Sequence, residues 1–457
     1  MTATPATTTT TPSPEDALQR GPGRWIDHWR PEDPEFWNSV GKPVARRNLT
    51  YSILAEHFGF SVWLLWSIVV VQLNNVGFDL SVSQQLWLTA VPSGVGAFLR
   101  IPYTFAVPIF GGRNWTVVSA LLLIIPCSLL MWAVSNPELP YGVLLLVAAT
   151  AGVGGGNFAS SMANISFFYP EKEKGFALGL NAAGGNVGVA VVQKLVPWVV
   201  GIGGGVALYR AGLIYIPFAV LAAILAYLFM DNLREAKADV RPTAKATKHL
   251  HTWIMSFLYI GTFGSFIGYS AAFPTLLKAV FNRPDIALTW GFLGAAVGSV
   301  ARPFGGKLAD RWGGARITLF AYGLMVVGAL VALWSLETKS LPVFFASFML
   351  LFVATGIDNG STYRMIPAIF RGLAAQHGDD PVTFLEFKRR AAGAIGIISA
   401  VGAFGGFFVP IVYAWSKDHY GTIKPALWTY VGLFAVMAAV TFVAYVRPGS
   451  KMAKLGV

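Results

Sequence analysis

Twelve runs of mainly apolar residues, each long enough to cross a membrane as a helix, make up most of this chain. A helix rises about 1.5 Å per residue, so about 20 apolar residues span the roughly 30 Å of hydrocarbon in a bilayer. A water-soluble core cannot hide such runs, because 55% of the 457 residues are hydrophobic and only 12% are charged. The sequence therefore predicts an all-α membrane protein with twelve transmembrane helices. We place them near residues 57–78, 84–110, 115–134, 140–168, 175–200, 207–230, 252–277, 286–311, 316–335, 341–370, 392–415 and 425–446.

The longest polar break between these runs falls at the middle of the series and contains several Lys and Arg residues. This position predicts two six-helix halves joined by a linker. The predicted parts are a tail at 1–45, a first bundle at 46–230, a linker at 231–251, a second bundle at 252–446 and a tail at 447–457.

The N-terminal tail has two parts of different composition. Its start, through Pro14, is rich in Thr, Pro and Ala, and we expect it to be disordered. Three tryptophans follow, Trp25, Trp29 and Trp37. Because tryptophan is enriched where membrane meets water, we predict that residues 22–45 lie at the membrane surface.

Positive charge predicts which side of the membrane holds the termini. Twelve crossings place both termini on one side, and loops rich in Lys and Arg face the cytoplasm. Of the 34 Lys and Arg residues, most fall on the side of the termini, which we therefore predict to be cytoplasmic. The basic residues assigned to the opposite side are Lys194, Arg210, Lys278, Arg283, Lys339, Lys417 and Lys424.

Other classes of function lack the residues that they need. The net charge of +12 sits in short stretches between apolar runs, so we expect no nucleic-acid partner. The single cysteine, Cys127, excludes an internal disulfide and a cysteine metal site. The six histidines fall in the tail, loops or helix edges, so we expect no enzyme, no metal and no cofactor. A phosphate-binding G-x-x-x-x-G-K-[ST] motif, which an ATP-driven pump needs, does not occur.

An arginine recurs at the same place in each half. Arg100 precedes Gly111-Gly112 by eleven residues, and Arg302 precedes Gly313-Gly314 by eleven. Eleven residues of helix measure about 16 Å, so both arginines are expected near the middle of the membrane. Burying an arginine there costs roughly 2.5 to more than 10 kcal/mol, so each needs a compensating partner.

The compensating partner is either a carboxylate or a bound anion. The candidate carboxylates are Glu56, which we place at the cytoplasmic edge of the first helix, and Asp358, within the tenth. At most one of these carboxylates is therefore expected to pair with the two guanidiniums. This excess of positive charge predicts a positively charged cavity. Arginine stays protonated, and its planar fork suits a planar oxyanion.

The remaining residues expected to line the cavity are mainly aromatic. Phe60, Phe158, Tyr259 and Phe263 favour a small, weakly hydrated, monovalent anion over phosphate or sulfate. Asn186 supplies a buried amide that can donate to such an anion.

Several stretches resemble known transporters. The run GKLADRWGGAR (306–316) is similar to the loop between helices eight and nine of the major facilitator superfamily. RIPYTFAVPIFGG (100–112), GNFASSMANISFF (156–168), and the glycine-rich GFALGLNAAGGNVG (175–188) and GAIGIISAVGAFGG (393–406) resemble the NarK-type nitrate/nitrite porters. The resemblance runs from about residue 47 to the end of the twelfth helix.

This resemblance implies a major facilitator fold that transports nitrate and nitrite across a bacterial inner membrane, as a monomer within the lipid bilayer. It implies that Arg100 and Arg302 coordinate the anion and that Phe158 and Phe263 hold it from either side. Phe60, Tyr259 and Asn186 match further positions of the pocket. Asp358 departs from the family pattern, which has a small residue there.

Two modes of coupling remain open. We favour exchange of nitrate for nitrite, because two unpaired positive charges oppose closure of an empty carrier. The alternative is symport of nitrate with a proton, with Asp358 or Glu56 as the proton-binding residue.

Overall fold

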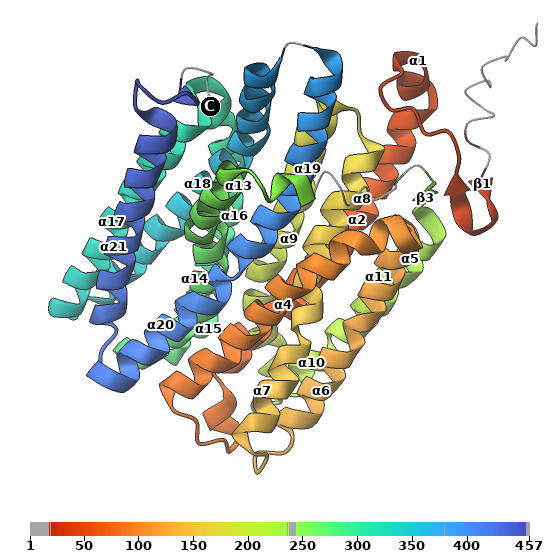
Figure 1. Cartoon of the computed structure of the whole chain (residues 1–457). Coiled ribbons are helices and arrows are strands. Elements are labelled where there is room, and N and C mark those ends of the chain that lie inside the picture. The colour runs from red at the N-terminus through yellow and green to blue at the C-terminus, as the bar shows by residue number, and fades with distance from the viewer. Residues whose placement is uncertain (1–17, 19, 235, 237–243, 379, 454–457) are drawn as a thin grey trace, which may run out of the picture.

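The computed structural model describes residues 18, 20–234, 236, 244–378 and 380–453 (Figure 1). In this part of the chain, twelve helical spans are long and apolar enough to cross a membrane. The prediction of an all-α membrane protein with twelve transmembrane helices is confirmed. The disorder expected through Pro14 concerns residues outside the described part.

The first half contains six spans, several of them built from two or more helices in line. They are Pro34–Val69 (α1 Pro34–Phe36, η3 Trp37–Gly41, α2 Lys42–Trp63, α3 Trp66–Val69), Val82–Phe110 (α4), Gly112–Val134 (α5 Gly112–Leu122, α6 Ile124–Val134), Tyr141–Phe168 (α7 Tyr141–Thr150, α8 Gly152–Phe168), Glu171–Val200 (α9) and Arg210–Phe229 (α10 Arg210–Leu213, α11 Tyr215–Phe229). A short 3₁₀ turn, η4 (Leu73–Val76), follows the first span.

The second half repeats this build. Its spans are Leu250–Phe281 (α13 Leu250–Tyr259, η5 Ile260–Gly264, α14 Ser265–Phe281), Pro284–Trp312 (α15 Pro284–Trp290, α16 Phe292–Trp312), Gly314–Glu337 (α17), Leu341–His377 (α18), Val382–Tyr420 (α19 Pro381–Ala403, α20 Gly405–Tyr420) and Lys424–Val446 (α21 Lys424–Thr441, η6 Phe442–Val446).

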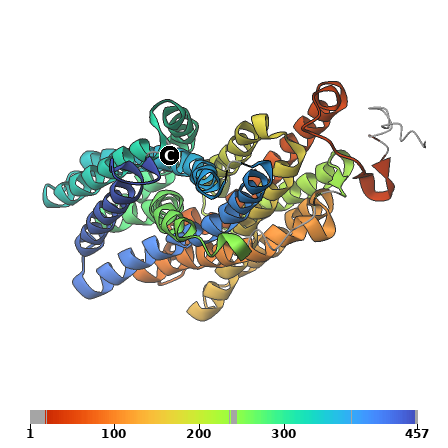
Figure 2. The ribbon, with the colours of Figure 1, turned by 45° about the horizontal axis from the view of Figure 1, so that its top comes forward.

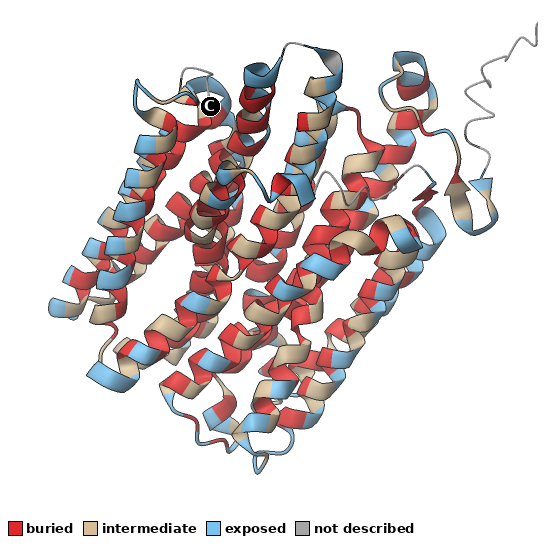
Figure 3. Cartoon of the chain, viewed as in Figure 1, coloured by how far each residue is buried: buried red, intermediate tan, exposed pale blue. Residues whose placement is uncertain are grey.

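The two halves lie side by side, with the first half in red to yellow-green and the second in green to blue (Figures 1 and 2). Buried residues line the interior of each bundle and the seam between the bundles, while the outer helices expose one face (Figure 3). Those outer faces carry large apolar side chains, such as Leu146 and Phe176, which are 70% and 76% exposed. A membrane, not water, is the solvent that such faces suit.

The first helix differs from the prediction. It begins at Pro34 rather than near residue 57 and ends at Val69 rather than near 78. The side chain of Asp33 caps its start by accepting from the backbone N–H groups of Glu35 and Phe36. A count of apolar residues misses its polar first turns. Glu56 consequently lies well inside α2 and fully buried, not at the cytoplasmic edge as predicted.

The repeated glycines end the helices that carry the two arginines. Gly111 follows α4 and Gly313 follows α16, each with φ of 88°. A backbone at this positive φ is strained for residues other than glycine, and the next helix begins directly after each of these glycines. At Gly111 a side chain is also excluded, because a Cβ atom would lie 2.3 Å from Oδ1 of Asn232. The two halves therefore place their arginines at matching depths from matching turns.

A three-stranded sheet, absent from the prediction, joins the N-terminal segment to the end of the first half. Its strands are β1 (Arg20–Gly21), β2 (Trp25–Ile26) and β3 (Asn232–Leu233); β1 pairs antiparallel and β3 parallel with β2. Asp231, which precedes β3, is fully buried and forms salt bridges with Arg20, Arg24 and Arg47 at 2.8, 2.9 and 2.5 Å. We call residues 20–26 and 231–233 the N-terminal clamp.

Two of the three tryptophans of this segment are buried inside the protein. Trp29 and Trp37 are 4% and 5% exposed. Their indole N–H groups donate to the carbonyl oxygen of Phe168 at 3.2 Å and to the carboxylate of Glu173 at 3.0 Å. Both indoles thus fix the N-terminal segment to the ends of α8 and α9, and the location of residues 22–45 at the membrane surface stays a prediction.

We expect Asp231→Asn to lower the free energy of unfolding by about 1–2 kcal/mol, since it removes three ion pairs whose arginines are partly exposed. Burial opposes ionisation of Asp231, but the bonds and charges of Arg20 and Arg47 outweigh it and hold its pKa below the ordinary 3.8. A lowered pKa means that the clamp stabilises the fold above pH 3.8 and loses this contribution as the pH falls through the lower value. Thermal unfolding in detergent measures the effect, and equal acid sensitivity of the variant and the parent would contradict it.

Candidate functional site

Arg100 and Arg302 come from opposite halves and are both buried inside the protein. Arg100 lies on α4 and Arg302 on α16, and their exposed fractions are 0% and 5%. Neither forms a salt bridge with a carboxylate among the described residues. The interior therefore holds two guanidiniums without a directly paired negative charge.

The guanidinium of Arg100 is fixed by backbone and hydroxyl oxygens. Its Nε donates to the carbonyl oxygen of Gly155 at 3.3 Å, and its Nη1 donates to the carbonyl oxygen and Oγ of Ser399 at 3.1 and 2.8 Å. Nη2 is buried and has no hydrogen-bond partner in the described part of the chain. Ser399 lies on α19, so the bond joins the two halves. The sequence prediction missed Ser399, although it lies within the glycine-rich stretch 393–406.

Aromatic rings form the walls beside this guanidinium. Its Cζ lies 4.4 Å from the ring centre of Phe158 and 4.8 Å from that of Phe263. The two ring centres are 5.8 Å apart, at an interplanar angle of 28°. A planar ion between two ring faces needs about 7 Å, which is twice a contact distance of about 3.5 Å. The rings must therefore separate by about 1 Å before an anion can enter between them.

Arg302 faces the aromatic residues of the second half. Its Cζ lies 5.9 Å from the ring centre of Tyr363, and its Nη1 is buried without a hydrogen-bond partner in the described residues. Tyr259 stacks on Phe263 with ring centres 5.6 Å apart, and its hydroxyl donates to Oδ1 of Asn359 at 2.9 Å. Tyr363 and Asn359, both from α18, are further residues that the sequence prediction did not assign.

Phe60 extends the cluster within the first half, and Asn186 is a buried amide of the same half. The ring centre of Phe60 lies 6.0 Å from that of Phe158. Asn186, on α9, is 1% exposed, and neither its amide nitrogen nor its amide oxygen has a protein partner within the described residues. Most buried polar groups are hydrogen-bonded, so an unsatisfied amide here can serve a ligand or water.

The two carboxylates have different surroundings. Glu56 accepts hydrogen bonds from the hydroxyl of Ser161 and, at 2.5 Å, from the amide of Asn181, and its Oε1 has no partner among the described residues. Asp358 instead accepts from the hydroxyl of Thr362, one turn along α18, at 3.2 Å. Glu56 thus joins α2 to α8 and α9, whereas the hydrogen bond of Asp358 stays within α18.

The glycines allow backbones to approach closely beside the site. A Cβ atom at Gly402 would lie 2.3 Å from the ring of Tyr259, and one at Gly264 would lie 2.6 Å from Cα of Gly405. Close approach of helices through small residues is common in membranes. These glycines therefore set how near η5, with its aromatic residue Phe263, lies to α19 and α20.

Comparison with known proteins agrees with this architecture. A family model described as Major Facilitator Superfamily matches residues 52–377. Two solved structures, a partially occluded inward-open form of the xylose transporter XylE from E. coli and a D-xylose-proton symporter, share 15% and 16% identity, with TM-scores of 0.64 and 0.66. They cover 87% and 86% of this chain, and 98% and 96% of their own chains are matched. At this identity they show the fold alone.

Two curated relatives match nearly the full length. A nitrate/nitrite transporter, NarU, from Salmonella typhimurium is 40% identical over 446 residues, which is 92% of this chain and 96% of the relative. A probable nitrate/nitrite antiporter, NarK2, from Thermus thermophilus is 37% identical over 462 residues, or 95% and 99% of the two chains. Fold, repeat and relatives agree: the chain belongs to the NarK-type porter family of the major facilitator superfamily.

Proposed function

We propose that this protein exchanges nitrate for nitrite across a bacterial inner membrane by alternating access, as a monomer with both termini in the cytoplasm. The observation that carries the proposal is the pair Arg100 and Arg302, which are buried in opposite halves and each keep one guanidinium nitrogen without a partner in the described residues. The names of the relatives, which describe nitrate/nitrite transport and antiport, support it.

The chemistry of the walls favours a small, planar, monovalent anion. Nitrate and nitrite are flat and weakly hydrated, and each offers oxygens that a guanidinium fork can bind in pairs. Phe60, Phe158 and Phe263 offer no hydrogen bonds to replace the water shell of a multivalent anion. The free amide of Asn186 supplies an additional donor.

Exchange follows from the charges of the empty site. When the halves close without an anion, two guanidiniums meet in a medium of low dielectric constant and repel one another. A bound anion offsets this repulsion, so the loaded protein changes conformation more readily than the empty one. Each anion carried one way must then be replaced by one carried back.

One observation favours the second candidate, symport of nitrate with a proton. Glu56 is fully buried, keeps Oε1 without a partner in the part of the chain described, and joins α2 to α8 and α9 through its bonds to Ser161 and Asn181. A carboxyl that binds and releases a proton there can alternate with the anion in balancing the arginines. Asp358, whose carboxylate accepts a hydrogen bond only from Thr362 of the same helix among the described residues, is less suited to this role.

Replacement of the two carboxylates separates these candidates. Under exchange, we expect Glu56→Gln and Asp358→Asn to retain nitrate/nitrite counterflow, because the amides keep shape and hydrogen bonds while neither residue handles a proton. The measurement is nitrate uptake into nitrite-free proteoliposomes with an imposed pH gradient. Accumulation driven by the gradient and lost in Glu56→Gln, with Asp358→Asn as the matched control, would establish symport instead.

A further inference from the structure

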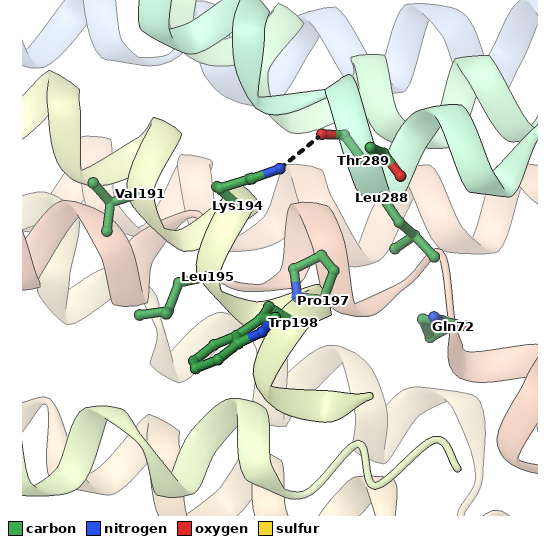
Figure 4. A pocket seen from close by; sticks show the side chains of 8 residues that line it. All are labelled: Gln72, Val191, Lys194, Leu195, Pro197, Trp198, Leu288 and Thr289. Atoms are coloured by element: carbon green, nitrogen blue, oxygen red, sulfur yellow. Dashed lines mark hydrogen bonds between the residues drawn. The ribbon is translucent and has the colours of Figure 1, made fainter. Parts of the chain in front are cut away.

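We propose that a phospholipid binds in a groove between α9 and α15, with its phosphate at Lys194 and an acyl chain along the apolar side chains beside it. The groove measures about 670 Å³ and is lined mainly by residues 191–198 of α9 and by Leu288 and Thr289 of α15 (Figure 4). We call it the lateral groove. Ligand pockets commonly measure about 300–1,000 Å³, so it has room for a headgroup and the first part of a chain.

The lateral groove lies near the membrane surface at the face opposite the termini. The fifth span, α9, ends at that face, and α15 begins the eighth span there. With 30 residues, α9 is about 45 Å long, and a bilayer with its headgroups measures about 40–45 Å. Lys194 precedes the helix end, Val200, by six residues, or about 9 Å. Its side chain therefore starts near the boundary between hydrocarbon and headgroups, within reach of lipid phosphates.

Lys194 is a charged residue in an otherwise uncharged stretch. No other charged residue occurs between Gly175 and Val200. Among the described residues, Lys194 forms no salt bridge, and its Nζ donates only to the carbonyl oxygen of Thr289, at 3.4 Å. This distance is long for a hydrogen bond. An ammonium group has three N–H donors, so Lys194 retains donors and an unbalanced charge for a ligand.

Aromatic rings hold the ammonium at this level of the membrane. Nζ of Lys194 lies 4.9 Å from the ring centre of Phe292 and 6.0 Å from that of Trp290. Trp290 and Trp198 are 49% and 68% exposed, and tryptophan is enriched where membrane meets water. A lysine near a helix end commonly extends outward to water. Lys194 instead reaches across the lateral groove to Thr289, where a headgroup can meet it (Figure 4).

The rest of the lateral groove has the polarity of a phospholipid. Val191 and Leu195, on the side of Lys194 away from the mouth, offer an acyl chain apolar contact. Gln72, in the turn after the first span, lies at the other end from Val191 (Figure 4). A soluble anion needs only the cation, and a hydrocarbon chain needs only the apolar wall. A phospholipid uses both, and lysine is a common ligand of phosphate.

Photolabelling of the purified full chain tests the site, with a phosphatidylglycerol that carries a diazirine near the start of one acyl chain. Peptide mass spectrometry measures saturable labelling within residues 191–198 and 284–290. We expect Lys194→Gln to raise the half-saturating lipid concentration about tenfold, because it removes a charge-assisted bond to the phosphate. Lys194→Arg should keep the wild-type value. The control Lys424→Gln removes an exposed lysine at the same face, which pairs with Glu337 at 2.6 Å, and should also keep it. A wild-type value for Lys194→Gln would overturn the proposal.

Competition in the wild-type protein gives a test that needs no variant. Unlabelled phosphatidylglycerol should suppress the labelling, diacylglycerol with the same chains should need about tenfold more, and inorganic phosphate at the same concentration should have no effect. If diacylglycerol competes equally, the phosphate has no role and the proposal fails. Displacement by inorganic phosphate would assign the lateral groove to a soluble anion, and absence of saturable labelling in both segments would exclude a lipid. None of these results depends on nitrate/nitrite exchange.

Discussion

We expect nitrate/nitrite exchange to fall about a hundredfold when either Arg100 or Arg302 is replaced by lysine, while insertion into the membrane stays normal. Lysine keeps the positive charge but loses the planar fork, and two charge-assisted hydrogen bonds are together worth about 3 kcal/mol. In the native protein, Nε of Arg100 donates to the carbonyl oxygen of Gly155 and its Nη1 donates to Ser399. Replacing Arg100 also leaves these acceptors without their donors. Initial rates of exchange in proteoliposomes, normalised to inserted protein, give the measurement.

Arg113→Lys is the matched control for this pair. Arg113 is 5% exposed, like Arg302, but its guanidinium donates to the carbonyl oxygens of Tyr227 and Gly23 near the N-terminal clamp. We expect a loss of stability in this variant without a specific loss of exchange. Exchange at the wild-type rate in both site variants would contradict the assignment of the arginines to the anion.

The second large effect is expected at the aromatic pair. Phe158→Ala and Phe263→Ala should each weaken nitrate binding about tenfold, because truncation admits water and removes a ring that shields the guanidinium. Both rings lie within 5 Å of Cζ of Arg100, so either truncation changes its surroundings directly. The measurement is the nitrate dissociation constant of the purified protein.

Phe348→Ala serves as the control for the aromatic variants. Phe348 is fully buried on α18 and packs on Phe273, with ring centres 4.9 Å apart, away from both arginines. Its truncation should lower the melting temperature and leave the dissociation constant unchanged. If Phe158→Ala and Phe263→Ala behave in the same way as this control, the two rings only pack the core.

The sequence predicted the site best where a charged residue interrupts a membrane-spanning apolar run. An arginine inside an apolar run is costly, so its recurrence at Arg100 and Arg302 was sufficient to predict a buried pair. The glycine turns at Gly111 and Gly313 predicted equal depth, and the structure places both after the arginine-bearing helices. Both signals are local in the chain, and so they can be read without knowledge of the fold.

What could not be predicted depends on contacts distant in the chain or on polar helical turns. Ser399 lies 299 positions from Arg100, and no local pattern pairs them. Glu56 was placed too near the membrane edge because the first turns of its helix are polar and escaped a count of apolar residues. The N-terminal clamp likewise joins β2 to β3 across most of the first half, through strands of two residues that have no detectable period.

Nitrate entry into nitrite-loaded proteoliposomes tests the central claim, obligate exchange, most directly. With no pH gradient, we predict rapid nitrate influx into vesicles loaded with nitrite and background influx into vesicles loaded with chloride, because only a bound substrate anion lets the two arginines pass through the closed state. The same vesicles containing Arg100→Lys should show background influx in both cases. Equal nitrate influx into nitrite-loaded and chloride-loaded vesicles would contradict exchange.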